Sequence, residues 1–376
     1  MQCIMVDFPQ ELVDAIIDHL IEDHLALLAC LSVSSFFRCR AQFHLFPTIR
    51  LTDKRDFDEF NLLCAESPSI PDLVKTLHVT LPESTISLPR LSQVHTLNFN
   101  GSLRVVPGDL ERFRRIFSWV PSTLTSLLIQ DITFSSTETF RSLIGGLPLL
   151  KSLSLLAVYA AGTGSEGSRP LGSSCDDKGP PIEVLSITSI NSDGVCAFFH
   201  GRPSLEPFAR HGLSELRFFG FALEQVAEIQ YVLDASRDSL RKLHLAPSFC
   251  PSSRWSDKQI LDVSHVPIIT LRLRGDWLYA SWALDWLVSC LEKGSYPLRV
   301  EQIIITVDKL FPPSSWTRMD EALCGDPNFS AIQVLVVLGG RIDRDTLADK
   351  GIVSATPGLY SEERVRVKYM ADDDVQ

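Results

Sequence analysis

The stretch LRKLHL at residues 240–245 decides the fold, because its spacing of apolar residues recurs along most of the chain. An apolar residue is followed by any two residues, a second apolar residue, any one residue and a third apolar residue. Alternation around the second apolar residue is typical of a short strand with one buried face. The copies begin at Val74, Val94, Leu124, Leu150, Ile182, Leu213, Leu240, Ile268, Val300 and Ile332. Their central residues, which we expect to point into a core, are Leu77, Leu97, Leu127, Leu153, Leu185, Leu216, Leu243, Leu271, Ile303 and Leu335.

Amphipathic helices are expected between many of these strands, most clearly at Asp109–Val120, Glu224–Ser236 and Tyr279–Glu292. Strand plus helix at intervals of about 20–30 residues resembles the unit of leucine-rich-repeat proteins. A single unit cannot bury its apolar face alone, whereas stacked units form one continuous core. The family's asparagine or cysteine after the strand is missing, so we expect an irregular α/β solenoid of short parallel strands.

A doubly wound α/β enzyme also alternates strands with helices and is the alternative fold. Its strands are buried on both faces and read as nearly continuous apolar runs. The strands here carry polar residues between the apolar ones, such as His78 and Asn98. The pattern therefore favours the solenoid.

The beginning of the chain differs from the repeats. The segment FPQELVDAIIDHL at 8–20 has the apolar spacing of a helix, and two further short apolar helices are expected before Pro47. A unit of about 45 residues is close to the lower size limit for independent stability, so it should bury surface against something else. From these residues alone, a cap on the chain's own core and a docking module for another protein both remain open.

The N-terminal pattern resembles the F-box family. The matching positions are Phe8-Pro9, Glu11-Leu12, Ile16, Leu20, Leu25 and Val33-Ser34-Ser35-Phe36-Phe37-Arg38. The chain has Phe8 where the family usually has leucine, Ser34 for cysteine and Phe37 for tryptophan. An F-box followed by leucine-rich repeats resembles the substrate adaptors of SCF-type ubiquitin ligases, and the irregular Ser/Pro-rich style is similar to the F-box families of basidiomycete fungi.

This resemblance implies that the helices dock on a Skp-family linker protein, which holds a cullin scaffold, while the repeats bind a target protein. The residues that we expect to contact the linker are Phe8, Pro9, Leu12, Ile16, Leu20, Leu25, Val33 and Phe37. The expected organisation is an F-box at 5–51, a linker helix at 52–72, a leucine-rich-repeat-like solenoid at 73–345 with a flexible loop at 162–181, and a C-terminal cap with an acidic tail at 346–376.

Residues next to the central leucines should lie on the uncovered face of the sheet. Repeats six to eight place basic and aromatic residues there, and the expected target-binding strip is Arg217, Phe219, Lys242, His244, Arg272 and Arg274. Arginine pairs in a bidentate manner with carboxylate and phosphate groups. An acidic or phosphorylated protein segment is therefore the expected ligand, although such charges also occur on ordinary solvated faces.

The composition and net charge of the chain restrict the possible classes of function and partner. The chain has 376 residues, a net charge of −11 and nine cysteines without a C-x-x-C pair. The negative charge argues against nucleic acid or anionic membranes as partners, and scattered cysteines favour reduced thiols in the cytoplasm or nucleus. The G-x-G-x-x-G match at 162–167 is followed by prolines rather than a helix, and Cys196 with His200 lacks further metal ligands. We therefore expect a protein that is not an enzyme and has no cofactor or metal. A repeat scaffold without a ligase role stays open as an alternative.

Overall fold

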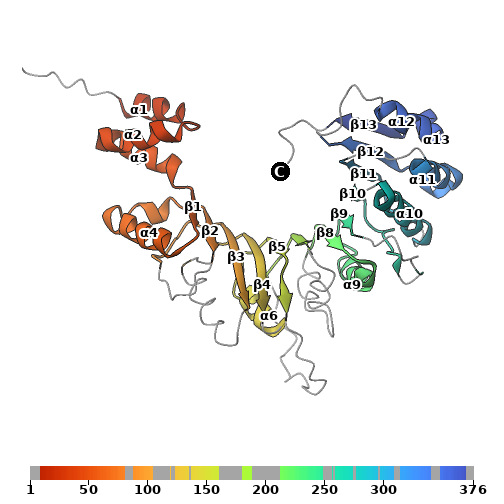
Figure 1. Ribbon diagram of the computed structural model, residues 1–376, viewed down its shortest axis with the longest axis horizontal. Coiled ribbons are helices and arrows are strands. Elements are labelled where there is room, and N and C mark those ends of the chain that lie inside the picture. The colour runs from red at the N-terminus through yellow and green to blue at the C-terminus, as the bar shows by residue number, and fades with distance from the viewer. Residues whose placement is uncertain are drawn as a thin grey trace, which may run out of the picture. The chain divides into compact units, whose positions relative to one another are not determined.

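The computed structural model in Figure 1 describes residues 9–80, 88–104, 119, 123–134, 137–160, 180–188, 212–248, 256, 259–273, 277–294, 297–308, 314–339 and 348–369. The described strands form a sheet in the order β1-β2-β3-β4-β5-β7-β8-β9-β10-β11-β12-β13, with β6 beside β4. Because each strand lies beside the next one in the chain, the sheet grows in one direction. A doubly wound sheet instead reverses its order at a switch point. The solenoid-like α/β arrangement is confirmed.

The chain divides into two compact units, 1–130 and 131–376. The first begins with three short helices, followed by strands and one longer helix. Its elements are α1 Gln10–Asp18, α2 His24–Val33, α3 Ser35–Leu45, β1 Thr48–Leu51, α4 Lys54–Glu66, η1 Ile70–Asp72, β2 Thr76–Thr80, β3 Thr96–Arg104 and β4 Ser126–Phe134, whose end belongs to the second unit. Asp23 begins α2 by accepting a hydrogen bond from the Ala26 N–H. Asp53 and Asp56 form a capping box at α4.

The second unit continues the alternation of strands and helices. Its elements are α6 Thr137–Gly145, β5 Ser152–Leu156, β6 Tyr159–Ala160, β7 Val184–Thr188, β8 Glu215–Phe221, η3 Leu223–Gln225, α9 Val226–Ala235, β9 Lys242–Pro247, β10 Ile268–Leu273, α10 Trp277–Lys293, β11 Gln302–Val307, α11 Ser314–Gly325, η5 Pro327–Phe329, β12 Gln333–Leu338, α12 Ala348–Ala355, α13 Pro357–Ser361 and β13 Val365–Tyr369. The expected helix at Asp109–Val120 lies outside the described residues apart from Trp119, as do residues 162–179 of the expected loop and the acidic tail.

Each strand has one buried and one uncovered face. In β9 the side chains of Leu243 and Leu245 are fully buried, while Lys242 is exposed and His244 is half-buried. The helices cover the buried face, as shown by the Phe221 ring on β8, whose centroid lies 5.8 Å from that of Trp286 on α10. Figure 1 shows α9, α10 and α11 on the same side of their neighbouring strands. This one-sided burial explains the apolar-polar alternation of the sequence.

Two of the expected repeat registers are wrong. In β10, Ile269 lies opposite Leu243 and Ile303, so Ile269 rather than Leu271 is the central residue. In β12, Val334 lies opposite Ile303, so Val334 and its neighbours at every second position point inward, whereas Leu335 points to the uncovered face. Runs of consecutive apolar residues satisfy the pattern in more than one register, and pairing with the adjacent strand selects one of them.

The sheet also continues beyond the expected limit at residue 345. Strand β13, with the sequence VRVKY, pairs in parallel with β12 through Val334↔Val365 and Leu338↔Tyr369. Its alternating apolar residues lack the spacing of the repeated hexapeptide, so the repeat search could not find it. The segment expected to be a cap thus contributes the last strand of the sheet.

A shared corner bends or ends several strands. The residue four positions after the central leucine has a positive φ in three cases, namely Asp131 (53°) after Leu127, Ala157 (50°) after Leu153 and Gly220 (71°) after Leu216. The left-handed conformation turns the backbone, and in β8 it produces an irregularity between Phe219 and Phe221. The recurrence of this corner at one position supports the interpretation of the strands as structural repeats.

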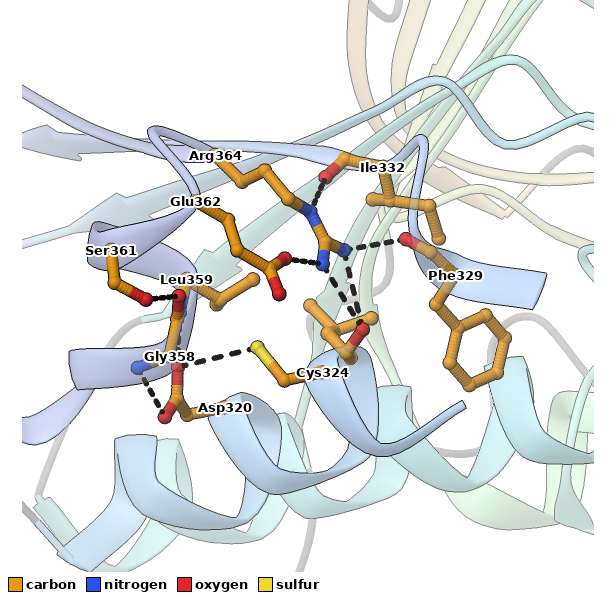
Figure 2. Close-up of polar contacts among 10 residues, drawn as sticks. Asp320, Cys324, Phe329, Ile332, Gly358, Leu359, Ser361, Glu362 and Arg364 are labelled. Carbon is orange, nitrogen blue, oxygen red and sulfur yellow. Dashed lines mark hydrogen bonds and ion pairs between the residues drawn. The ribbon is translucent and has the colours of Figure 1, made fainter. Parts of the chain in front are cut away.

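The C-terminal end is held by a buried arginine, shown in Figure 2. The Arg364 side chain is only 5% exposed. Its guanidinium donates to the main-chain carbonyls of Leu323, Phe329 and Ile332, and its Nη1 lies 2.6 Å from Glu362 Oε2. These carbonyls end α11, end η5 and precede β12. Arg364 therefore donates hydrogen bonds to main-chain carbonyls on three segments. These carbonyl oxygens have no hydrogen-bond partner within their own helix or strand.

Asp320 makes a second link within the same region. Its carboxylate accepts the main-chain N–H groups of Gly358 at 3.0 Å and Leu359 at 2.8 Å. The contacts shown in Figure 2 attach the start of α13 to the middle of α11. An added Cβ at Gly358 would lie 2.8 Å from the Cys324 Sγ atom, so the close approach of the two helices requires glycine there.

We predict that Arg364→Met lowers the free energy of unfolding by about 3 kcal/mol, because buried carbonyls lose their donor and Glu362 loses its partner. The matched control Arg366→Met, at an exposed position two residues away, should change it by less than about 0.5 kcal/mol. Urea denaturation followed by circular dichroism measures both values. Equal stabilities of the two variants would contradict the role assigned to Arg364.

Candidate docking surfaces

The three N-terminal helices have a small core of their own. Its fully packed members are Val13, Ile17, Leu27, Ala41 and Leu45, and Leu20, Cys30, Leu31, Phe37 and Phe46 pack partly against them. All three helices contribute to this core, so their mutual arrangement does not depend on the sheet alone. The core uses only some of the apolar residues that these helices carry.

Helix α1 has a second apolar stripe beside the buried one. Val13 and Ile17 face the core, whereas Leu12 and Ile16 are each one residue earlier and are 52% and 49% exposed. Residues i and i+4 lie one above the other on a helix, so Leu12 and Ile16 form a continuous exposed stripe. The helix is more apolar than its contacts within the chain require.

Helix α2 shows the same excess more strongly. Its sequence HLALLACLSV contains no acidic residue, lysine or arginine, and it is apolar on all sides. Only Leu27 is fully buried, and Leu31 packs partly on the core. Leu25 is 78% exposed, and Leu28 and Val33 are also exposed. A helix that is apolar all round is normally covered on all sides, so α2 lacks a covering partner within the described part of the chain.

Exposed large apolar residues are concentrated in this module. Eight of the twelve found among the described residues lie between positions 12 and 43: Leu12, Ile16, Ile21, Leu25, Leu28, Val33, Phe36 and Phe43. Single exposed apolar residues are common, whereas a concentration of them marks an interaction site. We call the residues on α1, α2 and the turn between them, Leu12, Ile16, Ile21, Leu25, Leu28 and Val33, the N-terminal apolar surface.

The structure divides the residues that we expect to contact a linker protein into exposed ones and ones that pack on the module's own core. Leu12, Ile16, Leu25, Val33 and Pro9 are exposed. Leu20 and Phe37 instead pack partly on the module's own core, and Phe8 lies outside the described residues. Sequence reasoning missed the exposed Ile21, Leu28, Phe36 and Phe43. A helical projection of α2 would have placed Leu28 beside Leu25, whereas Ile21 lies in a turn where periodicity gives no signal.

Hydrogen bonds among ionisable side chains hold α1 against α3. The Asp18 carboxylate accepts hydrogen bonds from Arg40 at 2.6 and 2.7 Å, and His44 Nε2 lies 2.7 Å from the same carboxylate. The Arg40 hydrogen bond, followed by that of His44, holds the pKa of Asp18 well below its usual range. Asp18 is therefore charged at neutral pH, and it positions the exposed stripe of α1 relative to α3.

A cavity of about 520 Å³ lies between α1, α3 and the segment before β2. It is lined by Gln10, Asp14, Ser35, Phe36, Cys39, Arg40, Phe43 and Leu73. The Phe43 ring has two cations near it, with Arg40 Cζ at 5.0 Å and Lys75 Nζ at 5.2 Å from its centroid. Asp14 and Leu12 lie on opposite sides of α1, so this cavity is separate from the Leu12 and Ile16 stripe.

The expected target-binding strip lies on the uncovered face of β8, β9 and β10. Arg217 is opposite His244 in the register, and Phe219, Lys242 and Arg272 share the same face. Arg274 lies outside the described residues. The structure brings acidic groups to these cations, because Glu215 Oε1 lies 2.6 Å from Arg217 Nε and 3.2 Å from His244 Nε2, and Asp308 lies 4.0 Å from Arg272.

The chemistry of His244 follows from this cluster. Burial lowers the pKa of His244, and Arg217 and Lys242 act in the same direction, while Glu215 opposes them. Neutral His244 adds little positive charge near pH 7. The strip is therefore less basic than its sequence indicates, and Lys242 is the most exposed of its described cations.

No family model matches the chain, and no curated protein is significantly similar to it. Among the described residues, no helix is long and apolar enough to cross a membrane. The same part of the chain contains no cluster of three or more histidine, cysteine or acidic side chains that could hold a metal ion. What these surfaces bind is therefore inferred from their own chemistry.

Two neighbouring leucines of α2 test how the structure divides buried from exposed residues. We predict that Leu27→Ala lowers the free energy of unfolding by about 2–4 kcal/mol, because Leu27 is 1% exposed and leaves a cavity in a small core. Leu28→Ala, at 46% exposure, should cost less than about 1 kcal/mol. Denaturant unfolding, followed with a probe placed on the N-terminal helices, measures the free energy of unfolding of both variants. A larger loss for Leu28→Ala than for Leu27→Ala would refute the assignment of Leu27 as buried and Leu28 as exposed.

Proposed function

We propose that this protein is a substrate adaptor of an SCF-type ubiquitin ligase, with the three N-terminal helices acting as an F-box. The observation that supports the proposal most directly is the N-terminal apolar surface, which a helical module exposes although it has a core of its own. The F-box resemblance of the sequence identifies the expected partner as a Skp-family linker protein, which in turn holds a cullin scaffold.

The energetics suit a stable docking interaction. Full burial of one large apolar side chain contributes roughly 1.5–3 kcal/mol, and a few such anchors dominate most interfaces. Leu12, Ile16 and Leu25 can supply these anchors without repacking, because they are already exposed on helices whose other faces are packed. A partner groove that accepts the faces of α1 and α2 would remove this apolar surface from water.

The sheet offers the complementary part of an adaptor. Its uncovered face is built from successive parallel strands, and such faces are the binding surfaces of repeat proteins. In this proposal the N-terminal helices attach the protein to the ligase, and the sheet face holds the target protein.

The proposal predicts that Leu12→Asp combined with Ile16→Asp reduces binding to a purified Skp-family linker protein by at least about 100-fold, because two desolvated anchors become charged. Both residues are exposed, so the fold should be retained. Leu62→Asp on α4 is the matched control, since Leu62 is also exposed at 61% but lies outside the module. Isothermal titration calorimetry with the full chain gives the affinities.

Undiminished binding by a well-folded Leu12→Asp, Ile16→Asp variant would rule out the proposed docking surface. Absence of linker binding by the unmodified chain would instead favour a repeat scaffold without a ligase role. Mass spectrometry of proteins captured by the full chain separates the two classes further, because an adaptor should retain both linker and cullin, whereas a scaffold would retain neither.

A further inference from the structure

The last strands of the sheet carry apolar residues on their uncovered face. In β12, Leu335 and Val337 point to this face, because Val334, Val336 and Leu338 are the buried residues of the strand. Leu335 lies opposite Ile304 of β11 in the register. Side chains opposite each other on adjacent parallel strands are neighbours, so these apolar residues form one group across two strands.

Basic residues border this apolar group. On β13, Arg366 lies opposite Leu335 and Lys368 lies opposite Val337, and both cations are exposed. On the other side, Arg272 of β10 lies opposite Thr306, which is itself opposite Val337. Asp308 is the acidic side chain near this border, 4.0 Å from Arg272. We call Ile304, Leu335, Val337, Arg366 and Lys368 the C-terminal sheet face.

This face carries more positive charge than strands β5 and β7. The outward positions of those two strands hold serines together with apolar residues and no lysine or arginine, namely Ser152, Ser154, Leu156, Val184, Ser186 and Thr188. The helices α10 and α11 pack on the opposite side of β10–β12 (Figure 1). No element among the described residues 212–369 lies over the C-terminal sheet face. The apolar side chains of this group are half-buried, and exposed basic residues lie beside them. In a protein of net charge −11, this pairing of apolar and basic residues is a local departure.

We propose that the C-terminal sheet face binds an acidic protein segment whose apolar side chains contact Ile304, Leu335 and Val337 and whose carboxylates pair with Arg366 and Lys368. Charge complementarity selects the acidic partner, and the apolar group selects one that is also hydrophobic. Within the proposed function this segment belongs to the target protein. In the strip around Arg217, Glu215 is paired with Arg217 and His244, so the proposal places the binding surface at the end of the sheet instead.

The test uses the full-length protein and two short fluorescent peptides, one alternating glutamate with leucine and the other alternating lysine with leucine. Fluorescence anisotropy should show at least about tenfold tighter binding of the acidic peptide. Arg366→Glu combined with Lys368→Glu should weaken its binding by about tenfold or more. The charge-matched control, Arg237→Glu with Arg241→Glu at exposed positions outside this face, should leave binding within about twofold.

A second variant tests the apolar component without changing charge. Leu335→Ser with Val337→Thr should also weaken binding of the acidic peptide by about tenfold, while circular dichroism stays unchanged because both side chains point outward. The proposal is overturned if the acidic peptide does not bind, if both peptides bind equally, or if neither variant changes the affinity. Binding that appears only after removal of residues 370–376 would also overturn it, since the chain's own acidic end would then be the ligand.

These measurements are independent of the linker protein. Loss of linker binding in the Leu12→Asp, Ile16→Asp variant concerns α1, and loss of peptide binding concerns β11–β13. A failed peptide experiment leaves the adaptor proposal in place, and a failed linker experiment leaves the binding face in place as part of a scaffold.

Discussion

One-sided burial of the strands is the constraint on which the rest of the structure depends. In successive repeats, residues such as Leu216, Leu243 and Ile269 lie opposite one another and are fully buried beneath the helices. No single repeat could bury these residues alone, because the apolar face of one strand needs its neighbours and a covering helix. Within the described part of the chain no helix covers the opposite face, so its composition is free to vary. The outward residues of β5 and β7 include serines and no basic residue, whereas those of β11–β13 are basic and apolar.

The same reasoning separates the N-terminal helices from the sheet. The sheet buries the apolar residues of its helix-covered face, and the helices α1–α3 bury some of theirs in the core around Ile17 and Leu27. The apolar residues left over, including Leu12 and Leu25, are not needed by either. Exposed apolar residues lower the solubility of a stable module. Burial of these residues against a binding partner explains why the module keeps them. The adaptor proposal therefore depends on a surplus of apolar surface rather than on the presence of three helices.

The repeated hexapeptide was sufficient to predict the class of fold and the position of most strands. The amphipathic pattern of the segments between the repeats predicted the helices α9 and α10. Prediction failed where the sequence satisfied two registers, as in the VLVV run of β12, and where a strand lacked the hexapeptide, as in β13. The sequence indicated exposed residues such as Leu12 and Leu25 but missed Ile21 and Leu28. The division into exposed Leu12 and packed Leu20 depends on how α1 sits against α3. The pairing of Arg217 and His244 with Glu215 arises from strand register, which the order of charges along the chain does not contain.

Hydrogen–deuterium exchange of the full chain with and without a purified Skp-family linker protein tests the central claim most directly. Exchange reports local opening of backbone hydrogen bonds, and docking should slow it in the helices that become covered. We predict that saturating linker protein slows exchange in peptides from α1 and α2, residues 10–33, and leaves α4 at residues 54–66 unchanged. Unchanged exchange throughout 10–33 in the presence of saturating linker protein would contradict the claim that the N-terminal apolar surface is its docking site.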